Sequence, residues 1–183
     1  MKALKNYKLA VVLTVAVCLL SLLFGVHRTM SAEARKISEA FQNGTDGSGY
    51  GIAGDLKDRA DYADYLVKIA EKYDGLSEQS AAVTKAVSAL NAATGAAEKY
   101  DQNEALTAAV TALDLALQDA PLSDKDEKYR SEYTALISSC SDTISHEAPS
   151  YNALVRTYET RLGGFPVSLL RPAAFLPVVE EFA

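Results

Sequence analysis

The sequence predicts an all-α protein, an elongated antiparallel bundle of about four helices preceded by one N-terminal transmembrane helix. Three observations support this prediction. An uncharged apolar run lies near the N-terminus, apolar residues beyond it recur every three or four positions, and no segment there alternates polar and apolar residues as a strand would. We therefore expect helices linked by short turns along the whole chain.

The apolar run begins at Leu9, ends at Val26 and has no charged residue. As an α-helix it covers roughly 27 Å, close to the hydrocarbon thickness of a bilayer. Lipid offers no partner for a bare backbone amide, so a lone spanning segment is helical. We divide the chain into a cytoplasmic N-terminus of residues 1–8, a transmembrane anchor of residues 9–26 and an extracytoplasmic helical domain of residues 27–183.

The charges beside the run predict its orientation. Lys2, Lys5 and Lys8 precede it, and no acidic residue occurs before Glu33. Because basic flanks stay in the cytoplasm, they favour an inside N-terminus and an outside C-terminus, although Arg28 and its basic neighbours reduce the asymmetry.

A cleaved signal peptide is the alternative to an anchor. Residues 32–34, Ala-Glu-Ala, have the small-x-small form of a cleavage site, after Ala34. The apolar run exceeds the ~7–15 residues usual for a signal peptide, which favours a retained anchor.

Charge and cysteine usage exclude several classes of function. All 24 acidic residues lie beyond residue 30 with only 14 of the 18 basic residues, so this part is strongly acidic. Nucleic acids need clustered Lys and Arg, so no nucleic-acid partner is expected, and the same sign disfavours an anionic lipid surface. Cys18 lies in the apolar run, which excludes a disulfide framework, and Cys140 is expected to be a small buried side chain.

Glycine-rich residues 43–51 predict a loop, and periodic stretches after it predict the bundle. The first covers residues 55–73, with Asp55 as its N-cap and Gly75 as its left-handed exit. The second runs from Ser77 towards residue 97. A further helix is expected to restart at Asp101, because Glu104 three residues later resembles a capping box.

Two more helices and an apolar tail follow. Ser123 and the acidic residues after it open one helix, Pro149 kinks or ends it, and Ser150 caps another that ends at residues 163–164, Gly-Gly. Residues 165–183 are apolar and interrupted by proline. We expect this tail to fold back and seal a groove of the bundle; the alternative is a docking strip for a partner protein or the membrane interface.

Two short motifs lie in the predicted helical domain. The C-terminal motif is YNALVRTY followed by FP, and the upstream motif is LKDRAD. Their principal residues are Tyr151, Asn152, Val155, Tyr158, Phe165, Pro166, Leu56, Arg59 and Asp61. Together with the N-terminal anchor, these motifs resemble the LemA family. The chain departs from the family at Glu159, where a second Asn is usual, at Pro149, and at residues 44–51, where part of a helix is replaced by a loop.

The resemblance implies a bacterial single-pass protein with its helical bundle outside the cytoplasm. It supplies no catalytic residue to carry over, so the motif residues are expected to be structural. Asn152 is expected to hydrogen-bond a neighbouring helix or turn and thereby define register. No catalytic, cofactor-binding or metal-binding residue is predicted, and the protein is not expected to be an enzyme.

These observations together favour a membrane-tethered scaffold or adaptor for other envelope proteins. One alternative is a sensor that binds a small ligand between helices, in a cavity lined by tyrosines. Another is a metal-dependent enzyme built on carboxylates. Di-iron bundles use Glu-x-x-His pairs, and neither His27 nor His146 has a glutamate three residues before it.

Overall fold

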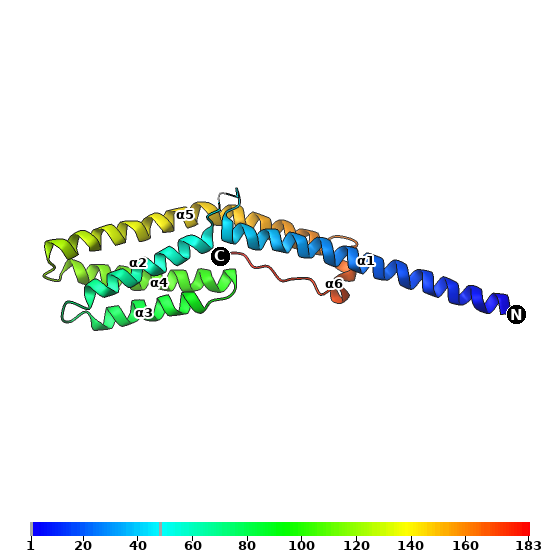
Figure 1. Cartoon of the computed structure of the whole chain (residues 1–183), viewed down its shortest axis with the longest axis horizontal. Coiled ribbons are helices and arrows are strands. Elements are labelled where there is room, and N and C mark those ends of the chain that lie inside the picture. The colour runs from blue at the N-terminus through cyan, green and yellow to red at the C-terminus, as the bar shows by residue number, and fades with distance from the viewer. Residues whose placement is uncertain (1, 48) are drawn as a thin grey trace. The chain divides into compact units, whose positions relative to one another are not determined.

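The computed structural model describes residues 2–47 and 49–183, with side chains from residue 7 onward (Figure 1). Met1, in the predicted cytoplasmic N-terminus, and Ser48, in the predicted loop, lie outside the described residues. Within those ranges the chain forms helices and no strand, which confirms the all-α prediction. The helices are α1 (Lys2–Asn43), α2 (Ile52–Ala70), α3 (Ser77–Ala92), α4 (Ala96–Gln118), α5 (Asp124–Gly163) and α6 (Val167–Ala174).

The contacts divide the chain into two compact units. The first, here called the anchor unit, combines Met1–Ile37 with Val155–Val179. The second, the bundle unit, combines Ser38–Leu154 with Glu180–Ala183. Helices α1 and α5 each contribute residues to both units. The predicted extracytoplasmic domain, residues 27–183, is likewise divided between the two units.

The anchor unit contains the apolar run. The part of α1 from Tyr7–Asn43 includes a window of mean hydropathy 2.8 with none of its residues buried, and it is long and apolar enough to cross a membrane. Beyond the run, α1 buries Met30, Ala34 and Ile37, which share one face because they are three or four residues apart. Glu33 on α1 forms an ion pair with Arg161 on α5 within this unit.

The bundle unit packs α2, α3, α4 and the first part of α5 side by side, and consecutive helices run in opposite directions through short turns (Figure 1). Each helix buries one stripe of apolar residues, as the spacing predicts. The most deeply buried of these include Ile52, Leu66, Val83, Leu90, Leu106, Leu113 and Leu117.

Helix α2 begins one turn earlier than predicted. Its N-cap is Gly51, and the Asp55 side chain is buried in the first turn instead of capping it. A Cβ atom at Gly51 would lie 2.5 Å from the nitrogen of Gly44 and 2.8 Å from the carbonyl oxygen of Phe41. Only glycine permits this close return of the loop, so the loop and not Asp55 determines the start of the helix.

Helix α4 also begins earlier than predicted, at Ala96 instead of Asp101. The carboxylate of Glu98 accepts a hydrogen bond of 3.0 Å from the backbone N–H of Thr94, which satisfies a free amide at this end. Asp101 and Glu104 lie inside the helix, because the alanines before and after them favour a continuous helix over a new start at Asp101.

Helix α5 continues through Pro149, so of the two outcomes predicted there, a kink or an end, the end is wrong, and so is the predicted new cap at Ser150. Proline removes one backbone hydrogen bond and clashes with the preceding turn, at a cost of about 3 kcal/mol. Ile144 before it and Tyr151 after it are both buried. Burial of side chains on both sides of the proline offsets the cost of the lost hydrogen bond. This packing cannot be predicted from the local sequence pattern.

The last residues of the tail pack into the bundle unit. Phe182 is buried, with its ring centroid 6.0 Å from that of Phe41 and 5.3 Å from that of Tyr100. The prediction that the tail folds back and covers a groove is confirmed for this end of it.

Candidate functional site

The C-terminal motif binds the backbone of the tail. In the bundle unit, the Asn152 amide donates to the carbonyl oxygen of Phe182 at 3.0 Å and accepts from its N–H at 2.8 Å. The Tyr151 hydroxyl donates to the carbonyl oxygen of Glu180 at 3.0 Å. Asn152 satisfies both backbone groups of one buried residue, and Tyr151 satisfies an oxygen two residues before it. The partner of Asn152 is therefore the tail, where a neighbouring helix or turn was expected.

The electrostatics keep these tyrosines as neutral donors. Burial, and next the negative charge of Glu180, raises the pKa of Tyr151 to about 12. In the anchor unit, burial and then Glu33 raise the pKa of Tyr158 as well. Both hydroxyls therefore stay protonated at neutral pH and donate to backbone carbonyls without interruption.

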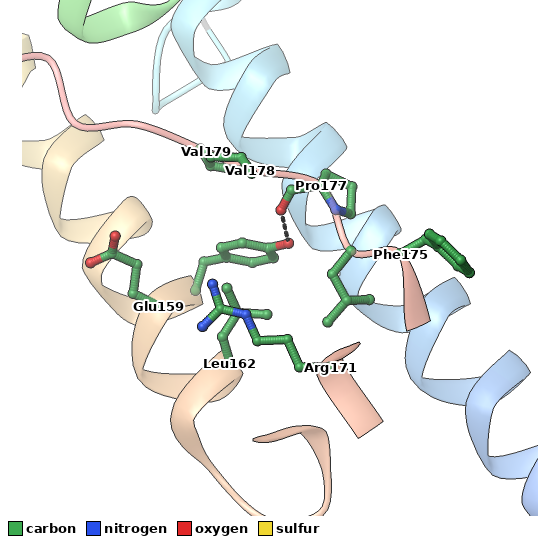
Figure 2. Close-up of a pocket in the computed structure, with 9 residues that line it drawn as sticks. Glu159, Leu162, Arg171, Phe175, Pro177, Val178 and Val179 are labelled. Atoms are coloured by element: carbon green, nitrogen blue, oxygen red, sulfur yellow. Dashed lines mark hydrogen bonds between the residues drawn. The ribbon is translucent and has the colours of Figure 1, made fainter. Parts of the chain in front are cut away.

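Tyr158 lies at a pocket in the anchor unit (Figure 2). Its hydroxyl donates to the carbonyl oxygen of Pro177 at 2.8 Å, which holds the segment after α6 against α5. The pocket has a volume of about 380 Å³, and Arg171 and Glu159 are the charged residues that line it. The rest of the lining is Leu162, Phe175, Leu176, Val178 and Val179.

The other motif residues of this region have different environments. Val155 is fully buried in the anchor unit, and Pro166 directly precedes α6. Phe165, expected to be structural, leaves 87% of its side chain exposed, so packing does not explain it.

The upstream motif places Arg59 in the interior of the bundle unit. Leu56 is buried beside it, whereas Asp61 is on the surface in an ion pair of 2.5 Å with Lys57. The Arg59 guanidinium is 2% exposed and donates to the side-chain oxygen of Asn103 and, at 2.8 Å, to the hydroxyl of Thr107. Burial lowers its pKa. Its Nε atom has no hydrogen-bond partner among the described residues.

Arg59 also lines a pocket of about 250 Å³ in the bundle unit. Hydroxyl side chains predominate among its polar lining residues, which are Thr107, Thr111, Thr134, Ser138 and Ser141 beside Asp114. Asp114 is compensated by Arg130 at 2.6 Å. No tyrosine lines this pocket. A smaller pocket of about 150 Å³ in the bundle unit, between α2 and α5, is lined by Tyr65, Tyr129 and Tyr133, which is the kind of lining expected for a ligand sensor.

A row of tyrosines, here called the tyrosine patch, lies at this pocket; the sequence suggested a tyrosine-lined cavity between helices, but not which tyrosines meet or that they stack at the surface. Its members are Tyr62 and Tyr65 on α2 and Tyr129 and Tyr133 on α5, all in the bundle unit. The Tyr133 ring stacks on the other three, with centroid distances of 6.3, 5.1 and 6.1 Å to Tyr62, Tyr65 and Tyr129. The only signal in the sequence is the spacing of three and four residues on two separate helices.

Lysines border the tyrosine patch. The Lys68 ammonium lies 4.7 Å above the Tyr65 ring, and that of Lys125 lies 5.8 Å from the Tyr129 ring. Lys72 forms an ion pair of 2.6 Å with Asp126, which closes one edge of the patch. Tyr65 and Tyr129 are 42% and 38% exposed, so aromatic faces and cations are presented together at the surface.

Nucleophilic and metal-binding groups are not assembled in the described part of the chain. No group of three or more His, Cys, Asp or Glu side chains converges there. Cys140 is half-buried, and burial, followed by the charges of Asp55 and Asp58, raises the pKa of its thiol to about 11. A thiol with that pKa is a weak nucleophile at neutral pH.

The fold and these surfaces define a class of protein: a helical bundle joined to an apolar helix of membrane-spanning length, with motif residues that serve its own backbone. The LemA family model matches residues 50–178, and the chain belongs to the LemA family. No match was found among curated proteins or among solved structures.

Proposed function

We propose that this LemA-family protein is a membrane-tethered adaptor of the bacterial envelope, which holds partner proteins close to the membrane and has no catalytic activity of its own. Residues 9–26 anchor it, the N-terminus faces the cytoplasm, and the bundle unit lies outside. The long unburied apolar stretch of α1 and the basic residues before it support this arrangement.

The tyrosine patch is the observation that carries the adaptor proposal. Tyrosines supply large, rigid contact area with a polar end, and they are enriched at the energetic centres of protein interfaces. Lys68 and Lys125 add positive charge to a unit that is otherwise strongly acidic. We therefore infer a protein partner that presents carboxylates together with apolar side chains.

Site-specific photo-crosslinking tests the patch. A photoreactive phenylalanine analogue at Tyr65 is compared with the same analogue at Leu115, which is 58% exposed on α4. A discrete adduct with one protein, formed at position 65 and absent at position 115, is expected, and it should weaken in high salt and in a Tyr133→Ala background. Equal labelling at both positions, or no adduct at position 65 in intact cells, would refute the patch as a docking surface.

The orientation is tested separately. Single cysteines at exposed positions of the bundle unit are treated with a membrane-impermeant thiol reagent in whole cells. Labelling before lysis is expected on an extracytoplasmic domain. Labelling only after lysis would show that the bundle faces the cytoplasm and would end the proposed envelope role.

The pocket at Arg59 favours a second candidate function, the binding of a small anion between helices. A buried guanidinium with an unpartnered Nε atom beside several hydroxyls suits a small carboxylate or phosphate. Thermal unfolding with millimolar acetate, succinate and phosphate tests it. A stabilisation that Ser138→Ala reduces supports this function, and the absence of any shift excludes it in that concentration range.

A further inference from the structure

Helix α6 lies beside the end of the apolar run. Within the anchor unit, the Nδ1 atom of His27 is 2.8 Å from the carbonyl oxygen of Ala174, the last residue of α6. A carbonyl only accepts, so His27 donates this bond. His27 directly follows Val26, and one residue of helix rises about 1.5 Å. The end of α6 is therefore within about one helical turn of the boundary between the apolar run and the rest of the chain.

The side chains of α1 first become covered by other residues near this same boundary. Residues 7–22 of α1 are all exposed, whereas Leu23 and Val26 are partly covered. Met30 is the first residue of α1 to be buried. The anchor unit thus reaches the last turn of the apolar run and stops there, as expected for protein that ends at a membrane surface.

The segment around α6 exposes large apolar side chains in unusual density. Phe165, Leu169, Phe175 and Val178 are 87%, 72%, 86% and 84% exposed within fourteen residues. Such a concentration on a surface marks a contact with an apolar medium or partner. The inward side of the segment is fixed by the buried Ala174 and by the Tyr158 hydrogen bond to Pro177. Figure 2 shows the Phe175 ring pointing away from Leu162 and Glu159 of α5.

Charge distinguishes the anchor unit from the rest of the protein. Beyond residue 26 it contains six basic residues against two acidic ones, whereas the bundle unit contains nine basic against 22 acidic residues. The acidity that disfavours an anionic lipid surface belongs entirely to the bundle unit. Arg171 lies in the middle of α6 and is exposed, at the rim of the pocket at Tyr158. A long arginine side chain can turn from such a position to lipid phosphates while its stem remains against apolar groups.

We propose that residues 165–178 bind the headgroup region of the same bilayer that residues 9–26 span, with the four exposed apolar side chains in the upper acyl region and Arg171 at the phosphates. The bilayer is the occupant because the segment is continuous with the end of the apolar run and has the complementary charge. Helices of this kind sink about 5–10 Å into the boundary. This inference rests on the proposed membrane anchor.

The chain contains no tryptophan, which permits a direct test with the full-length protein. Leu169→Trp places one fluorophore on the proposed contact, and the protein is reconstituted in vesicles whose lipids are brominated either near the headgroup or deep in the chains. Two matched variants are Leu20→Trp, inside the apolar run, and Leu115→Trp, at an exposed position of the bundle unit. Each variant must show the same thermal transition as the parent.

The expected result is strong quenching of position 169 by the shallow bromines and weak quenching by the deep ones. Position 20 should respond to the deep bromines, and position 115 to neither. Quenching of position 20 but not of position 169 would refute membrane contact by α6 and leave the anchor intact. No quenching at position 20 would remove the anchor and the inference together.

A charge variant tests the role of Arg171. In vesicles with about 30% anionic lipid, Arg171→Glu in the Leu169→Trp background should reduce the shallow quenching at least twofold. In purely zwitterionic vesicles the same change should have a smaller effect. An effect that does not depend on lipid charge would overturn the proposed contact between Arg171 and phosphates. A change in the emission of the Leu169→Trp variant that follows protein concentration in detergent, together with no quenching by brominated lipid, would indicate a second copy instead of lipid.

Discussion

Replacement of Asn152 by alanine is the sharpest test of how the motif holds the tail. The change removes the two hydrogen bonds of 3.0 and 2.8 Å to the backbone of Phe182. Alanine offers neither a donor nor an acceptor, so one N–H and one C=O in a buried position lose their partners. The ring contacts of Phe182 with Phe41 and Tyr100 are left in place.

The magnitude follows from the two lost bonds. A typical hydrogen bond contributes about 0.5–1.5 kcal/mol net, and an unsatisfied buried group costs about 1–3 kcal/mol. Water reaches the freed groups once the tail opens, so the effect is limited by the cost of opening. We expect Asn152→Ala to favour the open tail by about 2 kcal/mol, which is roughly a 30-fold increase in the opening equilibrium.

Amide hydrogen exchange of Phe182 in the full-length protein measures this opening directly. Asn152→Asp retains an acceptor for the Phe182 N–H but loses the donor to its carbonyl, so about half the effect is expected. Leu154→Ala, at a 40% exposed position on the same helix, serves as the control and should leave protection unchanged. Phe182 protection within twofold of the parent in Asn152→Ala would show that the motif does not hold the tail.

Three further predictions concern other residues. The carboxylate of Asp126 accepts hydrogen bonds from Lys72 and other donors, which lowers its pKa below the ordinary 3.8. Its contribution to the free energy of unfolding is therefore present at neutral pH and is lost as the pH falls below about 4. The difference in melting temperature between the parent and Asp126→Asn should therefore be largest near pH 7 and vanish in acid. Cys140, in a Cys18→Ala background, should react with iodoacetamide at pH 8 about 100-fold more slowly than a peptide thiol, because its pKa is raised from 9.0 to about 11; equal rates would contradict its burial. Pro149→Ala restores a backbone hydrogen bond in α5 and should raise the free energy of unfolding by about 2 kcal/mol in urea titrations, and a loss of stability would show that the proline is favourable where it lies.

The separation of charge between the two units bears on how the protein could work. The anchor unit is basic beyond the apolar run, and the bundle unit is acidic. An acidic surface repels anionic lipid, so under the proposed function the bundle unit would stay available to other proteins while the anchor unit contacts the membrane. The net charge of the chain hides this division, because the two signs partly cancel.

Much of the fold could be predicted from the sequence because its signals are local. The apolar run is read from composition alone, and the helices follow from apolar residues three or four positions apart. Helix ends were predicted correctly where a local signal has no competitor, as at Gly163, where α5 ends, and at Ser123, whose hydroxyl accepts from the Asp126 N–H. Gly75 has the predicted left-handed conformation, with a φ of +87°, but α2 ends at Ala70, before the predicted residue 73. The motif residues could be singled out, but not their partners.

The tertiary structure decided everything that depends on residues distant in the chain. Helix α5 continues through Pro149 because packing on both sides offsets a local cost, and α2 begins at Ile52 because the loop returns to Phe41. The tyrosine patch exists only because two helices place their side chains on a common surface. Local preferences of up to about 1 kcal/mol per residue determine which segments are helical. Burial and hydrogen bonds between distant segments determine where the helices end, which faces pack together and where the tail binds.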